Sequence, residues 1–233
     1  MKSLYLFLFI SCSLGLNAQK NKHSRWNQML SQHVDAQGQV DYKNWLSEKN
    51  QLDAYIHTLE KMPPLEGASK EAKLAYWINA YNALTVQLIL ENYPLESIKD
   101  LDNPWDRDCI TVNNQTYTLG EIEHEILRKM DEARIHFAIN CASASCPKLR
   151  NEAYQEKQLD KQLTEATRDF LSDPTKNKLS PNHLQLSRIF LWFGNDFGSK
   201  SERLEFIAQY SDLILDRPKI DYLSYDWSLN QTH

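Results

Sequence analysis

The sequence lacks several features that are typical of large protein classes. It has only six glycines, no glycine-rich phosphate loop and no regular strand–helix alternation, so nothing predicts a nucleotide-binding fold. Its formal net charge is -5, and charges of both signs are interspersed without a basic patch. We therefore expect no nucleic-acid partner and no binding to anionic membrane surfaces. Beyond residue 20 no apolar run is long enough for an integral membrane span, and no internal repeat is present.

The first eighteen residues have the pattern of a signal peptide. An early lysine is followed by a short apolar run that ends at Leu16-Asn17-Ala18. This pattern predicts cleavage after Ala18 and export to the periplasm or the medium. A lipoprotein anchored through Cys12 is the alternative, although Phe9 fits the lipidation pattern poorly. Residues 19–233, about 215 in number, are long enough for one domain, which we take as the prediction.

Cysteine is scarce, and its count matters. Of the four cysteines in the sequence, cleavage would remove Cys12 and leave Cys109, Cys141 and Cys146. An odd number of cysteines in an exported protein leaves at least one thiol unpaired or paired between chains. The middle of the chain is therefore the first place to look for chemistry.

The predicted helices alternate with short strand-like segments. A helix over 70–92 is apolar on nearly every side, so we expect it to be the buried central element. Asn79 and Asn82 share its face of small residues and would need hydrogen-bond partners, which makes them candidate binding residues. The other predicted helices cover residues 24–35, 42–61, 119–130, 152–171 and 202–210.

Two hairpins and one further strand complete the prediction. Residues 109–117 turn at Asn113-Asn114, and residues 178–187 turn around Pro181-Asn182-His183. Strands are also expected at 39–42 and 134–140. Capping boxes are predicted at Thr118 with Glu121 and at Ser199 with Glu202. The resulting fold class is α+β, with a central buried helix, further helices and a small, mostly antiparallel sheet.

The stretch from His136 to Pro147 is the most unusual in the chain. Pro147 suits the first position of a helix, which would place Ser145 or Cys146 at the N-cap, where a thiolate is stabilised. Cys146 is then the predicted nucleophile and His136 its base. If residues 134–140 form a strand, His136 faces away from Cys141, so Cys146 is the better partner.

Other interpretations of these cysteines remain open. Cys141 and Cys146 could be joined in a disulfide, or one of them could pair with Cys109, because exported proteins fold in oxidising surroundings. A zinc site is less well supported, since no Cys-x-x-Cys or His-x-x-x-His spacing is present. No metal and no cofactor are predicted.

A second group of candidates lies on the helix predicted after Thr118. Glu123 falls within its apolar face, so this carboxylate is expected to be paired or to lie beside a cavity. His124 and Arg128 lie one turn apart towards the polar side. A surface histidine and a structurally paired glutamate are the alternatives.

Aromatic patches follow near the end of the chain, at residues 190–193 and 222–227. They predict either a ligand groove or simply core packing. Trp192 belongs to the first patch. Asp196 and Asp226 are polar exceptions beside these patches, and they are candidate site carboxylates.

Several segments resemble an uncharacterised family known as domain of unknown function 547. The matching segments are spread over most of residues 19–233 and comprise 38–42, 76–84, 93–98, Ile122-Glu123-His124, Leu127-Arg128, 134–138, 141–143, 145–147, 190–197 and 225–230. The family often has a second proline after the second cysteine, where this chain has Lys148. The resemblance implies a domain that occurs in exported bacterial proteins, but no settled activity.

Two functions follow from these observations. The first is a cysteine-dependent acyl-transfer enzyme, a hydrolase or transferase, with Cys146, His136 (or His124) and an orienting Glu123 or asparagine. The second is a non-catalytic module with a structural disulfide that binds a small molecule, peptide-like ligand or cell-envelope partner. A thiol–disulfide exchange protein is disfavoured, because four residues separate Cys141 from Cys146.

Overall fold

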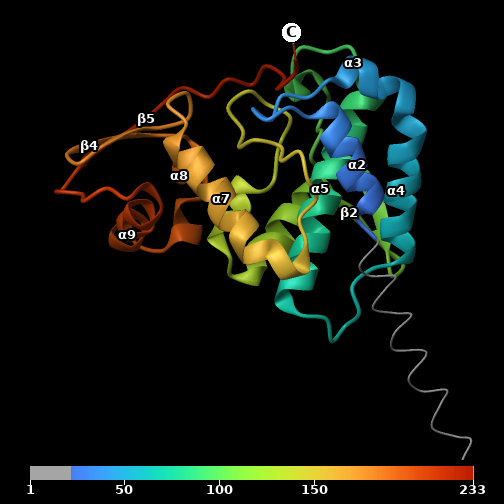
Figure 1. Ribbon diagram of the computed structural model, residues 1–233, viewed down its shortest axis with the longest axis horizontal. Coiled ribbons are helices and arrows are strands. Elements are labelled where there is room, and N and C mark those ends of the chain that lie inside the picture. Colours follow the sequence, from blue (N-terminus) through green and yellow to red (C-terminus); the bar gives the residue numbers. More distant parts are fainter. Residues whose placement is uncertain (1–21, 233) are drawn as a thin grey trace, which may run out of the picture.

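The computed structural model describes residues 22–232, so the predicted signal peptide, Cys12 and the cleavage after Ala18 lie outside the described residues. Helices dominate this part of the chain, which also contains a two-stranded and a three-stranded sheet (Figure 1). The α+β fold class is confirmed. Among residues 22–232, no helix combines the length and apolar character that crossing a membrane requires.

The first part of the chain packs around one long helix. This helix, α5 (Lys70–Asn92), has the predicted bounds and is buried over most of its length because few of its side chains are polar. Ser69 caps it by accepting a hydrogen bond from the Ala72 N–H. The other elements of this part are α2 (Ser24–His33), α3 (Tyr42–Trp45), η1 (Leu46–Glu48), α4 (Lys49–Lys61) and η2 (Ile98–Asp100), of which α3 and α4 contact α5.

The predicted hairpin and the helix after it both form. Strands β1 (Asp108–Val112) and β2 (Gln115–Thr118) pair antiparallel. Asn113 and Asn114 make the turn with φ of 52° and 64°, a left-handed conformation that asparagine tolerates. The helical run then continues through α6 (Leu119–Glu121), the π-helical η3 (Ile122–Leu127) and η4 (Arg128–Met130).

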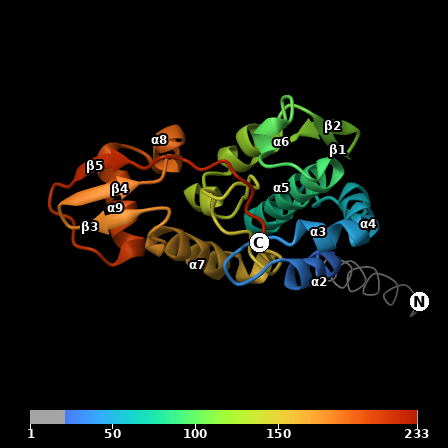
Figure 2. The ribbon, with the colours of Figure 1, turned by 90° about the horizontal axis from the view of Figure 1, so that it is seen from above.

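The last part of the chain forms a second group of elements. Figure 2 shows its strands and its last helix at the end of α7 (Leu159–Ser172) that lies away from α5. Strands β3 and β4 pair antiparallel, and β5 adds to β4 in parallel, so the sheets are mostly antiparallel as predicted. The elements are η6 (Glu156–Gln158), α7 (Leu159–Ser172), β3 (Lys178–Ser180), β4 (His183–Leu186), α8 (Ile189–Trp192), η7 (Gly194–Phe197), α9 (Lys200–Ser211) and β5 (Lys219–Tyr222).

Buried apolar side chains form two clusters, and α7 contributes to both. The larger cluster surrounds α5, and the smaller one lies between α7, β4, α8 and α9. The final segment returns from the second group to the first. There Ser228 bridges to Ser97, Leu229 to Ser143 and Gln231 to Val40.

Three predicted elements differ from the structure. Residues 134–140 are not a strand: Ala133–Phe137 form the short 3-10 helix η5, which packs against α7. No helix begins at Pro147; the chain is irregular until η6, so the helix expected over 152–171 begins later. Of residues 39–42, only Val40 makes strand-like bridges, and Tyr42 begins α3. Each of these segments is short, so its own pattern does not decide between a strand, a turn and a helix, and contacts with the rest of the chain determine its conformation.

Candidate functional site

A pocket of about 250 Å³ opens between the two groups of elements. The first part of the chain contributes side chains from α5, from the loop before β1 and from η3. The second contributes side chains from α8 and from the segment after β5. Its lining is largely aromatic, with few polar groups: Tyr81, Trp105, Glu123, His124, His136, Ile139, Cys141, Cys146, Pro147, Ile189, Trp192, Phe193, Tyr225 and Trp227.

Both cysteines of the middle stretch belong to this lining, and they are joined in a disulfide. Their Cα atoms are 6.2 Å apart. The Tyr225 hydroxyl donates to Cys146 Sγ at 3.2 Å, and the Cys141 N–H points at the same sulfur from 3.0 Å. The disulfide interpretation is therefore confirmed. In this state Cys146 has no thiol. The helix expected to begin at Pro147 is also missing from the described chain, so no helix N-terminus there would stabilise a thiolate.

Among residues 22–232, Cys109 is the cysteine that stays free, in agreement with the odd count that cleavage after Ala18 would leave. It lies half-buried on β1, and its Sγ donates to the Tyr117 carbonyl at 3.2 Å. Burial raises the pKa of this thiol to about 12, so it stays protonated at neutral pH and is a poor nucleophile.

His136 lies at the bottom of the site, on η5, and is nearly inaccessible to solvent. Its Nε2 lies 2.8 Å from Asp196 Oδ2, and its ring stacks on Phe193 with the centroids 4.3 Å apart. Its Nδ1 is buried and has no hydrogen-bond partner among residues 22–232. Burial lowers the pKa of this imidazole to about 4, so the ring is neutral at pH 7 and its Nε2 carries the proton given to Asp196.

Asp196 joins two of the predicted site residues. Besides His136, it accepts from Arg128 Nε at 2.6 Å and from Nη2 at 2.7 Å, a bidentate pair. The Arg128 guanidinium holds the pKa of Asp196 below its usual range. Arg128 also donates from Nη1 to His124 Nδ1 at 3.1 Å, as their spacing of one turn allows. His124, Arg128, His136 and Asp196 thus form one connected network at the edge of the pocket.

Glu123 is buried at the wall of the pocket, where its position on the apolar face of the helix suggested a pair or a cavity. The Tyr81 hydroxyl donates to Glu123 Oε2 at 3.1 Å, and no other hydrogen bond reaches this carboxyl group from the described residues. Burial raises the pKa of Glu123 above its usual value, although His124 and Arg128 act in the opposite direction.

The aromatic wall comes mostly from the two patches near the end of the chain. The centroid of Tyr225 lies 4.8 Å from that of Trp192 and 4.6 Å from that of Trp227, with planes inclined by 55° and 50°. Trp105 meets Trp227 edge-on at 5.9 Å. Phe190, in contrast, is part of the smaller core. The patches therefore provide both pocket and core.

Three predicted site residues lie away from the pocket. Asn79 binds both the N–H and the carbonyl of Tyr154, and Asn82 binds the Asn140 N–H and the Ala138 carbonyl. These amides fasten loops to α5, which satisfies the expected need for partners. Asp226 is exposed and accepts from the N–H and hydroxyl of Ser228, which stabilises the turn before the terminal bridges.

Sequence reasoning missed Tyr81 and Trp105 as pocket residues. Tyr81 lies within α5, where every neighbour is also buried, so the helical pattern does not separate it from the core. Trp105 belongs to the loop before β1, and no local pattern indicates its contact with Trp227. Both depend on contacts with distant parts of the chain.

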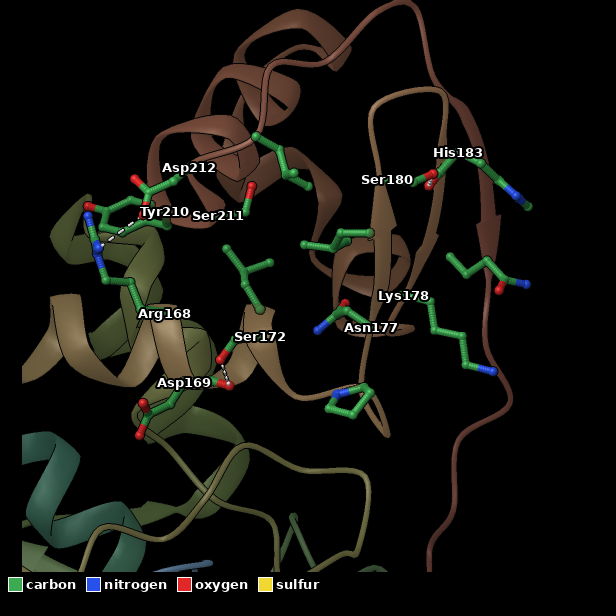
Figure 3. Close-up of a pocket in the computed structure, with 15 residues that line it drawn as sticks. Arg168, Asp169, Ser172, Asn177, Lys178, Ser180, His183, Tyr210, Ser211 and Asp212 are labelled. Carbon is green, nitrogen blue, oxygen red and sulfur yellow. Dashed lines mark hydrogen bonds and ion pairs between the residues drawn. The ribbon is translucent and has the colours of Figure 1, made fainter.

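A second, wider depression of about 680 Å³ lies where the ends of α7 and α9 meet β3 (Figure 3). Its charged side chains are largely exposed, and two of them, Arg168 and Asp212, form an ion pair at 3.4 Å. Such pairs in solvent contribute little and impose little specificity. The aromatic pocket is the stronger candidate because its polar groups are buried and incompletely paired.

Within residues 22–232, no three His, Cys, Asp or Glu side chains are grouped so that they could hold a metal ion. The disulfide also removes the two cysteines as thiolate ligands.

No curated protein and no solved structure gives a significant match to the chain. A family model described as a protein of unknown function, DUF547, matches residues 65–171. This range includes Glu123, His136 and both cysteines of the disulfide, whereas Trp192, Asp196 and Tyr225 lie beyond it. The resemblance seen in the sequence is thereby confirmed within residues 65–171, which match the DUF547 family, while the resembling segments 38–42, 190–197 and 225–230 lie outside the matched range.

Proposed function

We propose that this protein is a binding module whose aromatic pocket holds a small organic ligand. One observation carries the proposal: two buried polar groups, the Glu123 carboxyl and His136 Nδ1, border the same pocket without a full set of partners in the described part of the chain. Buried polar groups in a core are normally paired, because an unpaired one costs free energy. Groups left incompletely paired beside a cavity are typical of sites where a ligand completes the bonding.

The size and lining of the pocket indicate the kind of ligand. A volume of about 250 Å³ is small for a ligand site, so the occupant has few atoms or leaves part of itself outside. Aromatic side chains offer flat apolar surfaces, and Trp192 is itself 44% exposed at the mouth. A ligand with a flat apolar part and one polar end fits this lining.

The disulfide favours binding over thiol chemistry. The bond between Cys141 and Cys146 closes the loop of residues 141–146. In this state neither sulfur is a thiol that can attack a substrate. Export, which the first eighteen residues indicate, would keep this bond oxidised. Under this proposal the disulfide shapes the wall of the pocket.

The proposal is tested with three probes of almost equal size: 2-phenylethanol, 2-phenylethylamine and phenylacetate. Saturation-transfer NMR on the full chain should detect binding of at least one of them. Trp192→Ala should remove the signal because it removes part of the pocket wall. Leu191→Ala is the matched control, since Leu191 is the exposed neighbour and does not line the pocket. If no probe binds, or if both variants behave alike, the proposal is wrong.

A second candidate, Cys146-dependent acyl transfer, is favoured by the His136–Asp196 pair. Asp196 fixes the imidazole by accepting from Nε2, and this leaves the neutral Nδ1 available as a base. A dithiol reductant would first have to convert the disulfide into two thiols, becoming oxidised itself. Iodoacetamide should then label Cys146 faster in the reduced protein than in the reduced His136→Asn variant. Equal labelling rates would contradict this function.

A further inference from the structure

The charges around the aromatic pocket indicate the class of ligand, an inference that rests on the proposed function. We propose that the ligand is an organic ammonium ion, with its cationic group against the Glu123 carboxylate and its apolar part between the aromatic rings. The proposal depends on which charges in the site are already neutralised and which are not.

Glu123 forms no ion pair with any side chain of residues 22–232. Arg128 and Asp196 neutralise each other through two hydrogen bonds, and His136 is neutral. The Tyr81 hydroxyl that donates to Glu123 carries no charge. A cation beside Glu123 would supply the missing partner, and a charge-assisted hydrogen bond in such a site is stronger than a neutral one.

The composition of the lining disfavours an anionic ligand. None of the described residues that line the pocket is Lys or Arg, while one of them is Glu123. A carboxylate or phosphate group entering the pocket would therefore meet a buried acid and no free cation. The resulting repulsion, in surroundings where charges are weakly screened, opposes binding.

The aromatic wall favours a cation over a neutral ligand. The faces of Trp and Tyr rings attract cations electrostatically. The protein already uses this attraction at the edge of the site, where Lys99 Nζ lies 5.0 Å from the ring centroid of Trp227 and the Arg128 guanidinium 5.2 Å from that of Phe193. The lining has further rings over which no cation lies among the described residues: Trp105, Trp192 and Tyr225.

The same three probes test this inference through their ranking. Calorimetric titration at pH 7 should give 2-phenylethylamine, which is then protonated, a dissociation constant at least about tenfold lower than that of 2-phenylethanol. Phenylacetate should bind most weakly. The comparison uses the unaltered protein, so it does not depend on whether any variant folds.

A pair of variants locates the effect. Glu123→Gln should abolish the preference for the amine and bring the dissociation constants of the amine and of 2-phenylethanol to within about twofold of each other. Glu125→Gln should change neither, since Glu125 is exposed, pairs with Lys129 and lies outside the pocket. An amine that binds no better than the alcohol, or a preference that survives Glu123→Gln, would overturn the inference while the binding pocket stands. Absence of binding by all three probes would overturn both.

Discussion

At the scale of single residues, His136 has the least ordinary environment among the groups of the pocket. Its ring lies between Phe193 and Phe197, and Asp196 holds one nitrogen while the other lacks a partner. Burial opposes protonation more strongly than Asp196 favours it, because Asp196 is already neutralised by Arg128. The imidazole is therefore a neutral, oriented group, fit to accept a hydrogen bond from a ligand.

This environment predicts a dependence of stability on pH. Burial lowers the pKa of His136 from 6.5 to about 4, so between these values the unfolded chain binds a proton that the folded protein does not. The free energy of unfolding should accordingly fall as the pH falls from 6.5 to 4, by about 3 kcal/mol from this residue. Urea unfolding of the wild type and of His136→Asn at several pH values measures the difference in slope.

A second histidine, His23, contributes to the same pH dependence, so the experiment compares two proteins that both contain it. Burial also lowers the pKa of His23, to about 3, which gives both proteins a slope of the same sign. The difference between wild type and His136→Asn isolates His136 from this background. Identical slopes in the two proteins would show that His136 is protonated as readily in the folded as in the unfolded state.

At the scale of elements, the helical run from Leu119 to Met130 organises the polar side of the site. It begins at Thr118, whose hydroxyl accepts from the Glu121 N–H while the Glu121 carboxylate accepts from the Thr118 N–H. Its π-helical part then carries Glu123 and His124, and Arg128 follows one turn later. π-helical turns often occur at functional sites, because they shift side chains from the positions an α-helix would give them.

The capping box should therefore matter for both stability and the site. We expect Thr118→Ala to lower the free energy of unfolding by about 1 kcal/mol, since one N–H at the start of the helix loses its acceptor. Thr118→Ser keeps a hydroxyl and should restore most of the loss. Thermal or urea unfolding measures both variants. A Thr118→Ala protein as stable as the wild type would show that packing alone fixes the start of this helix.

At the scale of the whole molecule, the terminal segment after β5 connects the two groups of elements. Tyr225 and Trp227 complete the pocket, and the residues after them reach the first part of the chain. Asn230 is buried there. It accepts from the Tyr42 hydroxyl at 2.9 Å and donates to the Gly38 carbonyl at 3.3 Å. The pocket consequently depends on a connection between the two ends of the described chain.

Loss of this connection should destabilise the protein. Asn230→Ala leaves buried partners such as the Tyr42 hydroxyl without a bond, so we expect a loss of about 2–3 kcal/mol in the free energy of unfolding. Thr232→Ala is the matched control, because Thr232 is exposed and its backbone N–H makes the bond to Val40. It should stay within about 0.5 kcal/mol of the wild type. Equal effects of the two changes would mean that the Asn230 side chain does not secure the segment.

The sequence by itself determined the elements whose signals are local. The apolar helix α5, the Asn113-Asn114 hairpin and the caps at Ser69, Thr118 and Ser199 follow from periodicity, turn chemistry and hydrogen bonding between near neighbours. The same local reasoning placed Glu123 on an apolar face and joined His124 with Arg128.

Only the tertiary structure decided the architecture of the site. Asp196 lies 60 residues from His136 along the chain, and Tyr81 lies 42 residues from Glu123, so no local pattern could indicate these pairs. The segments around His136 and Pro147 were predicted wrongly because short segments take their conformation from contacts with distant parts of the chain. The disulfide likewise required the two sulfurs to be brought together in space, whereas the sequence left both bonded and free cysteines open.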